Sequence, residues 1–201
     1  MRKRNKTDYL AAIKTALGSS WGELDKLPPS DMPVVMVVDT MAFIQRYKHL
    51  GSSTFHNLQG KYLKQLFRII PDKCNCIHFV GDQYDVSPAE SLKGEERENR
   101  MNTCPSKMKE YKPDTLPIPE WIGCIHNPLK KANLLNYMGE TWAAQHKSLP
   151  AGCILILGGI FHDPGRTVLL SADCQVELPE LSCEKHEEAD TRMFAHIAYS
   201  V

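Results

Sequence analysis

Runs of apolar residues along the first half of the chain predict two buried strands joined by a helix. The segment 34–40, "VVMVVDT", holds five consecutive apolar residues, typical of a strand buried on both faces in the middle of a parallel sheet. The segment 74–82, "CNCIHFVGD", predicts a second strand. Between them an apolar stripe at helical spacing runs up to Pro71: Leu58, Tyr62, Leu66 and Ile69. Strand, helix and strand in this order predict a right-handed parallel crossover.

The second half continues the alternation of elements, which predicts an α/β protein. Residues 127–146 have a helical pattern, and two apolar runs within 153–171 are separated by an Asp-Pro-Gly turn that predicts a β-hairpin. The last segment, 186–201, is expected to form a helix that buries Met193, Phe194 and Ile197. Residues 87–100 are polar and charged, as in a surface helix or helical loop.

The composition is that of a globular domain with a core: 42% of the 201 residues are hydrophobic and 24% are charged. We expect residues 1–30 to form a basic N-terminal helix and linker, and residues 31–201 to form the main domain. The start, "MRKRNK", carries four bases and suits a nuclear address, a phosphate contact or simply a solvated terminus.

Features absent from the sequence bear on the cellular location of the protein and on metal binding. Neither a membrane-length apolar run nor a secretory leader is evident, so we expect an intracellular protein, nuclear or cytoplasmic, with no membrane partner. The seven cysteines are then expected to be reduced. Cys74, Cys76 and His78 share one strand face, and Cys183 precedes His186, but because the chain has no Cys-x-x-Cys pair we expect no zinc.

Four acidic residues stand where the predicted elements would bring them together. Asp39 and Asp82 end the first two strands, while Glu188 and Asp190 begin the last helix. Each alone fits a turn, a helix cap or the helix dipole. Jointly, four hard oxygen ligands at one sheet edge would bind one or two Mg²⁺ or Mn²⁺ ions, which activate water for phosphodiester cleavage.

These motifs resemble the PIN-like nucleases, in particular the flap-endonuclease-like branch and an animal group that shares "HEEADTR". The matching stretches are "VVMVVDT", "HFVGDQYD…SLKGEERENR" and "HEEADTR", and the resemblance covers about residues 34 to 200. It implies a three-layer PIN-like fold with a mostly parallel central sheet and flanking helices. The resemblance also implies catalytic and metal-binding roles for four residues: Asp39, Asp82, Glu188 and Asp190.

A basic helix is the other element that the resemblance implies. Lys93, Arg97 and Arg100 lie on one helical face and would hold the scissile phosphate. The alternative is a surface helix held by ion pairs with the interleaved glutamates.

The chain departs from the family at its end, because the family continues after the last helix into a strand that carries further acids. We therefore expect either a fragment or a site that is incomplete by nature. Residues 102–145 lack a helical arch, so specificity for flaps is not expected. Three hypotheses stay open: a nuclease acting on DNA or RNA, an inactive module that binds nucleic acid or protein, and a truncated remnant with an unpaired sheet edge.

Overall fold

A computed structural model describes residues 11, 14–16, 18, 33–50, 54–71, 73–84, 127–183 and 188–200. The contacts divide the chain into two units, residues 1–32 and residues 33–201. In the first unit the described residues 14–16 are helical, and Thr15 Oγ1 donates a hydrogen bond to the carbonyl of Ala11. All the elements below belong to the second unit.

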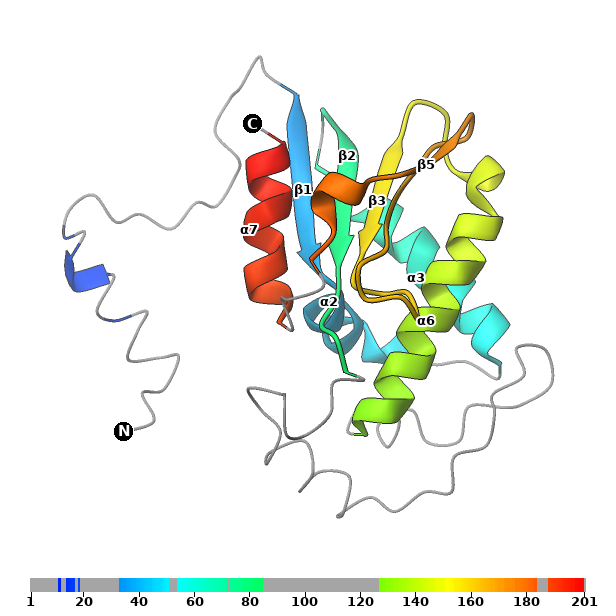
Figure 1. Cartoon of the computed structure of the whole chain (residues 1–201), viewed down its shortest axis with the longest axis horizontal. Helices are drawn as coiled ribbons and strands as arrows, with labels where there is room; N and C mark the ends of the chain where they lie inside the picture. Colours follow the sequence, from blue (N-terminus) through cyan, green and yellow to red (C-terminus); the bar gives the residue numbers. More distant parts are fainter. Residues whose placement is uncertain are drawn as a thin grey trace. The chain divides into compact units, whose positions relative to one another are not determined.

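A five-stranded mixed sheet forms the centre of this unit (Figure 1). Its strands follow one another in sequence order: β1 (Val34–Asp39), β2 (Cys74–Val80), β3 (Ile154–Gly158), β4 (Thr167–Leu170) and β5 (Gln175–Glu177). β1, β2 and β3 are parallel to one another, and β4 pairs antiparallel with β3 on one side and with β5 on the other. The α/β class and the hairpin within 153–171 are thereby confirmed. The exposed, three-residue β5 was not predicted, because so short a polar strand has no apolar pattern.

Helices lie on both faces of the sheet (Figure 1). They are α2 (Thr40–Arg46), α3 (Phe55–Arg68), α6 (Pro128–Ala144) and α7 (Ala189–Tyr199), with 3-10 turns at Lys48–Leu50, His146–Ser148 and Pro179–Leu181. Thr54 caps α3 and Asn127 caps α6, each through a side-chain oxygen that accepts a backbone N–H. Pro128 fits at the first position of α6, where no backbone donor is needed.

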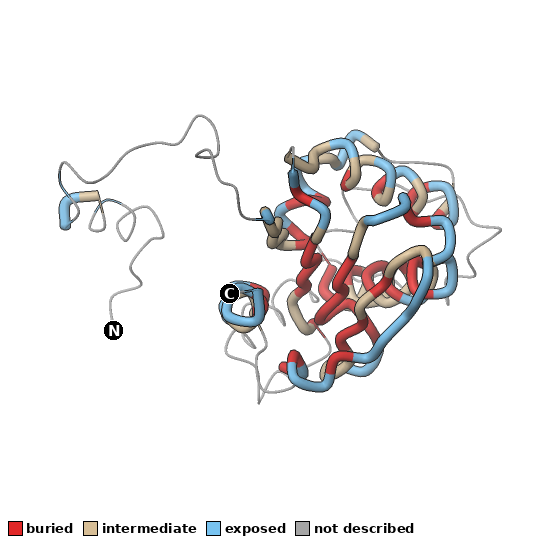
Figure 2. Tube along the Cα trace, turned by 90° about the horizontal axis from the view of Figure 1, so that it is seen from above, coloured by how far each residue is buried: buried red, intermediate tan, exposed pale blue. Residues whose placement is uncertain are grey.

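The main core lies between the sheet and the helices α3 and α6. Trp142 is fully buried against Phe79, with ring centroids 5.3 Å apart, and its indole Nε1 donates to Gln59 Oε1 at 2.9 Å. This bond satisfies the polar atom of a large buried ring and joins α6 to α3. Figure 2 shows the buried positions concentrated in the strands and on the inner faces of these helices.

Two expectations about burial were wrong. β1 lies at the edge of the sheet, not in its middle, and all six of its residues are half-buried. On α7 the buried residues are Ala189, Arg192 and His196, whereas Phe194 is 72% exposed and Ile197 is 48% exposed. Among the described strands β1 pairs with β2 alone, and on α7 the apolar side chains of Phe194 and Ile197 are left exposed.

The predicted crossover from β1 through α3 to β2 is confirmed by the parallel register of the two strands. β2 is itself central, between β1 and β3, and its residues from Ile77 to Val80 are buried. Helix α7 packs on β1 and β2 from the face opposite α3 and α6. The predicted basic helix at 87–100 lies outside the described residues.

Candidate functional site

Two acidic residues leave adjacent parallel strands at the same edge of the sheet. Asp39 is the last residue of β1 and pairs with Val80, the last residue of β2. Asp82 follows two residues later, after Gly81. The carboxyl ends of parallel strands are where α/β proteins bind ligands. The shared edge expected for Asp39 and Asp82 is therefore present.

Asp39 caps helix α2. Its Oδ1 accepts hydrogen bonds from the backbone N–H groups of Met41, at 2.8 Å, and Ala42, at 3.0 Å. Both bonds end on Oδ1, and no described group is bonded to Oδ2. Asp39 therefore has the ordinary capping role that the sequence allowed, and this role uses one of its two carboxylate oxygens.

Asp82 joins the end of β2 to the start of α7. Its Oδ1 accepts from the backbone N–H of Ala189 at 2.6 Å, and its Oδ2 accepts from the Tyr84 hydroxyl at 2.9 Å. A helix start carries unsatisfied N–H groups and partial positive charge, so the Asp82 carboxylate serves as a cap supplied from another element. This bond places the N-terminus of α7 at the same edge.

The other two predicted acids occupy the first turn of α7. Glu188 is its N-cap residue, half-buried, and its side chain makes no capping bond. Asp190 is exposed. Within the described ranges, no three residues among His, Cys, Asp and Glu are grouped so that they could hold a metal ion. Metal binding by the four acids therefore stays a prediction.

The two strand-end acids line different hollows. Asp39 lies in a groove of about 600 Å³ between β1 and α2, together with Arg46 and Tyr47. Asp82 lies in a hollow of about 10 Å³ with Gln83 and Pro164 among its neighbours. The second hollow has room for about one water molecule, so it cannot hold a substrate in this conformation.

A buried arginine behind this edge was not singled out from the sequence. Arg192 is 1% exposed; its Nη1 donates to the Pro164 carbonyl at 3.1 Å and its Nη2 to Gln83 Oε1 at 3.4 Å. Its guanidinium therefore joins α7 to the loops that follow β2 and β3. The three- and four-residue spacing of Ala189, Arg192 and His196 was the available signal, because it places all three on one helical face.

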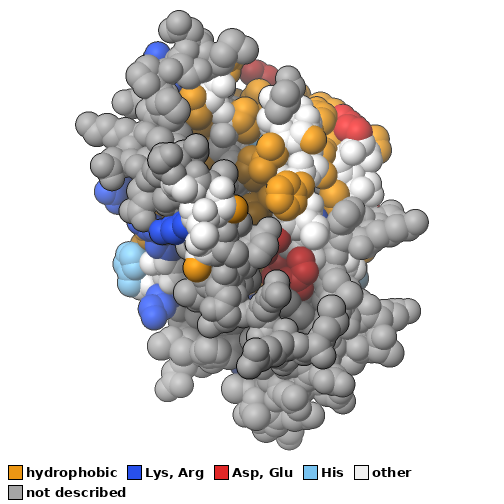
Figure 3. Space-filling view, turned by 90° about the vertical axis from the view of Figure 1, so that its left-hand side faces the viewer, with side chains coloured by type: hydrophobic (Ala, Val, Ile, Leu, Met, Phe, Trp, Pro, Cys, Tyr) orange, Lys and Arg blue, Asp and Glu red, His pale blue; other side chains and the backbone are white. Residues whose placement is uncertain are grey.

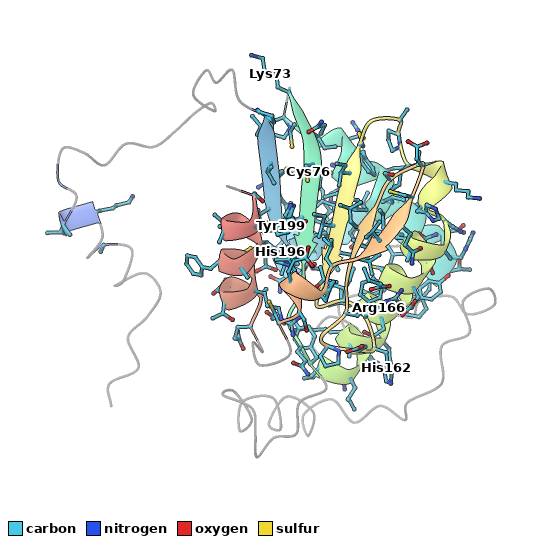
Figure 4. All side chains as sticks on the ribbon, turned by 45° about the horizontal axis from the view of Figure 1, so that its top comes forward. Lys73, Cys76, His162, Arg166, His196 and Tyr199 are labelled. Carbon is cyan, nitrogen blue, oxygen red and sulfur yellow. The ribbon has the colours of Figure 1, made fainter. Side chains whose placement is uncertain are left out.

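A buried histidine pair lies further along the same helix face. His78 on β2 and His196 on α7 are each 1% exposed, with their Nδ1 atoms 3.0 Å apart. Burial lowers the pKa of His78 to about 4; the pKa of His196 is also about 4, lowered first by burial and in addition by the neighbouring His78 and Arg192. Figure 4 shows His196 and Tyr199 on α7 facing the strands.

The thiols on the same strand are in ordinary strand positions. Cys74 Sγ donates to the carbonyl of Cys76 at 3.3 Å. Burial raises the pKa of both thiols, which disfavours the thiolate form that metals and electrophiles require. Of the remaining candidates, Lys93, Arg97, Arg100 and His186 lie outside the described residues.

Known proteins provide no further guide to the site. Compared with models of protein families, with curated proteins and with solved structures, the chain has no significant match. None of the described helices has the length and apolar character needed to cross a membrane.

Proposed function

We propose that this chain is a metal-dependent phosphodiesterase of the PIN-like type that cleaves DNA or RNA. The observation that carries the proposal is the meeting of three elements at one sheet edge: β1 ends in Asp39, β2 continues to Asp82, and α7 begins on the Asp82 carboxylate. The sequence motifs that resemble the PIN-like family contain these same positions.

The donor atoms at this edge fit a hard divalent cation in kind. Carboxylate oxygens are the ligands that Mg²⁺ and Mn²⁺ prefer. Thr40, next to Asp39, is fully buried, and its Oγ1 has no hydrogen-bond partner in the part of the chain that the structure describes. A buried hydroxyl without a partner favours an ordered water or another ligand near Thr40, the chain neighbour of Asp39.

Each proposed ligand has a defined supporting structure. The backbone of α2 fixes Asp39 through Oδ1, so Oδ2 can accept a further ligand. Asp82 is oriented by Ala189 and Tyr84, and Glu188 and Asp190 stand on the helix that Ala189 begins. When bound, one or two ions would supply an activated water and charge stabilisation for the departing oxygen. Lys93, Arg97 and Arg100 are proposed to hold the scissile phosphate.

The second candidate is a catalytically inactive module that binds nucleic acid or protein. It is favoured by the engagement of the acidic oxygens, because Oδ1 of Asp39 and both oxygens of Asp82 already accept hydrogen bonds. It is also favoured by the separate hollows that the two acids line. A truncated remnant without independent activity is the third alternative, and it is favoured by the position of β1 at the edge of the sheet that the described strands form.

Cleavage of labelled single-stranded and branched DNA and RNA with Mn²⁺ separates these candidates. The full chain should cleave at least one substrate, and Asp82→Asn should reduce the rate by at least tenfold, since the amide keeps the shape but loses the charge. Asp173→Asn, at an exposed acid in the β4–β5 turn, is the matched control and should cleave at the normal rate. Equal rates for the Asp82→Asn variant and the unaltered chain would exclude the proposed site. A well-folded chain that binds nucleic acid without cleaving it would favour the inactive module.

A further inference from the structure

A buried lysine near the start of α6 lies next to the candidate site. Lys131 is the fourth residue of α6 and is 7% exposed. Its Nζ lies 5.0 Å from the centroid of the Tyr84 ring, and the Tyr84 hydroxyl donates to Oδ2 of Asp82 at 2.9 Å. Ala132 and Leu135 of the same helix line the small hollow that contains Asp82 and Tyr84. The start of α6, which has no part in the proposed function so far, therefore packs against a proposed metal ligand.

Lys131 approaches Asp82 from inside the protein. Figure 3 shows a group of acidic side chains near the centre of the face that carries α7, while most basic side chains of that face lie to the left. Lys131, by contrast, is buried and is separated from Asp82 by the Tyr84 side chain. Its charge can therefore act on the carboxylate through this tyrosine.

The position of Lys131 is unfavourable for a positive charge. Removal of an ammonium group from water is unfavourable unless other groups of the protein interact with it. The first turn of a helix also carries partial positive charge, which repels a cation. Attractive contacts must offset both effects, and the contact with the electron-rich face of the Tyr84 ring is one of them. A lysine at this place therefore indicates a role for its charge.

The Tyr84 ring connects the charge of Lys131 to Asp82. An ammonium group above an aromatic ring attracts the π electrons of the ring. The phenol oxygen then loses electron density and its O–H becomes a stronger donor, because neighbouring polar interactions polarise one another. Tyr84 is 8% exposed and belongs to the main core, which holds the ring in place. Asp82 is thus held at both oxygens, at Oδ2 by Tyr84 and at Oδ1 by Ala189.

We propose that Lys131 is a positioning residue for Asp82, because it strengthens the Tyr84 hydrogen bond that orients the carboxylate. The consequence for metal binding rests on the proposed function, in which Asp82 is a ligand. Loss of a group that orients a ligand typically weakens metal binding by about 10–100-fold. Direct repulsion has the opposite sign, because removal of a lysine that only repelled the cation would strengthen metal binding. The direction of the change therefore separates the two roles.

Mn²⁺ binding by the full chain, followed by electron paramagnetic resonance, measures this direction. Lys131→Met keeps the length of the side chain without its charge and should weaken binding by about tenfold, and Tyr84→Phe by at least as much. In the Tyr84→Phe background, Lys131→Met should change the affinity by less than about twofold, because the lysine acts through the hydroxyl. Lys130→Met is the matched control, since Lys130 is the half-buried neighbour on the same turn, and it should not weaken binding. Lys131→Gln repeats the test with a polar side chain, and urea unfolding verifies that each variant folds.

Hydrogen exchange of the Ala189 amide, measured by nuclear magnetic resonance, tests the positioning of Asp82 without a metal. This amide donates to Oδ1 of Asp82, so it reports on how firmly the carboxylate is held. Lys131→Met and Tyr84→Phe should each speed its exchange by about fivefold, and Lys130→Met should leave it unchanged.

Three results would overturn the proposal. They are stronger Mn²⁺ binding by Lys131→Met, an equal effect of Lys131→Met with and without the Tyr84 hydroxyl, and unchanged Ala189 exchange in both Lys131→Met and Tyr84→Phe. If the unaltered chain binds no Mn²⁺, the proposed function fails, and the exchange rates alone decide whether Lys131 positions Asp82.

Discussion

The backbone N–H of Ala189 donates a hydrogen bond of 2.6 Å to Oδ1 of Asp82, across 107 positions of sequence. This bond fixes the start of α7 at the carboxyl edge of the sheet, beside the strand that ends in Asp39. A helix start that receives a carboxylate from another element depends on that carboxylate for its first turn. The same residue therefore has a structural role that can be measured apart from any catalytic one.

Removing the Asp82 side chain should destabilise the fold. In Asp82→Ala, the Ala189 N–H loses its acceptor, and we expect a loss of about 1–2 kcal/mol in the free energy of unfolding. Asp82→Asn keeps a carbonyl oxygen as acceptor and should lose less than half as much. Urea unfolding monitored by circular dichroism measures both, with Asp173→Ala as the exposed control. Equal stability of Asp82→Ala and the unaltered chain would show that the bond contributes nothing.

Acid should weaken the packing of α7 on β2. The pKa of His78 and of His196 is lowered by burial from 6.5 to about 4, so between these pH values the unfolded chain binds protons that the folded chain does not. The contribution of the two neutral imidazoles to the free energy of unfolding is present in full above pH 6.5 and is lost as the pH drops toward 4. At 1.4 kcal/mol per pKa unit, the loss for one imidazole is up to about 3 kcal/mol.

The urea midpoint at pH 7.5 and at pH 5.0 measures this effect. We expect a lower midpoint at pH 5.0, and a smaller difference between the two pH values in the His78→Gln, His196→Gln double variant. The variant with both His56→Gln and His162→Gln removes two exposed histidines and should keep the full difference. If the double variant showed the same difference between the two urea midpoints as the unaltered chain, a group other than His78 and His196 would cause the loss of stability in acid.

Substitution by alanine should have opposite effects on stability at two glycines. Gly159 has a φ of 69°, and a Cβ there would collide with the Gly81 carbonyl and lie 2.8 Å from Arg192 Nη1. Gly159→Ala should therefore cost more than about 2 kcal/mol. Gly60 lies within α3 with open space around it, so Gly60→Ala should stabilise the protein by up to about 1 kcal/mol. Thermal or urea unfolding of both variants measures the contrast, and a stabilised Gly159→Ala variant would contradict the close packing at this edge.

The order and type of the main elements could be predicted because their apolar patterns are local. The crossover from β1 to β2 and the hairpin of β3 and β4 followed directly from sequence. The edge position of β1 could not, because five apolar residues have the same pattern whether one edge or both are paired.

Much of the candidate site could not be predicted from the spacing of apolar residues. Helical spacing predicted an apolar buried face on α7, yet the face against the sheet contains Arg192 and His196. Their partners, Gln83 and His78, lie more than a hundred positions away in sequence. Asp39 and Asp82 could be placed at one edge because each follows an apolar run, but the capping bonds that orient them depend on elements folded around them.

Binding of Mn²⁺ by the full chain, followed by the loss of the free-ion signal in electron paramagnetic resonance, tests the central claim without a choice of substrate. Asp39→Ser is the most informative variant, because serine can still cap α2 but supplies no carboxylate. We predict saturable binding by the unaltered chain and by Asp173→Asn, and at least tenfold weaker binding by Asp39→Ser and Asp82→Asn. Equal binding by all four proteins would contradict a cation site at the carboxyl edge of β1 and β2.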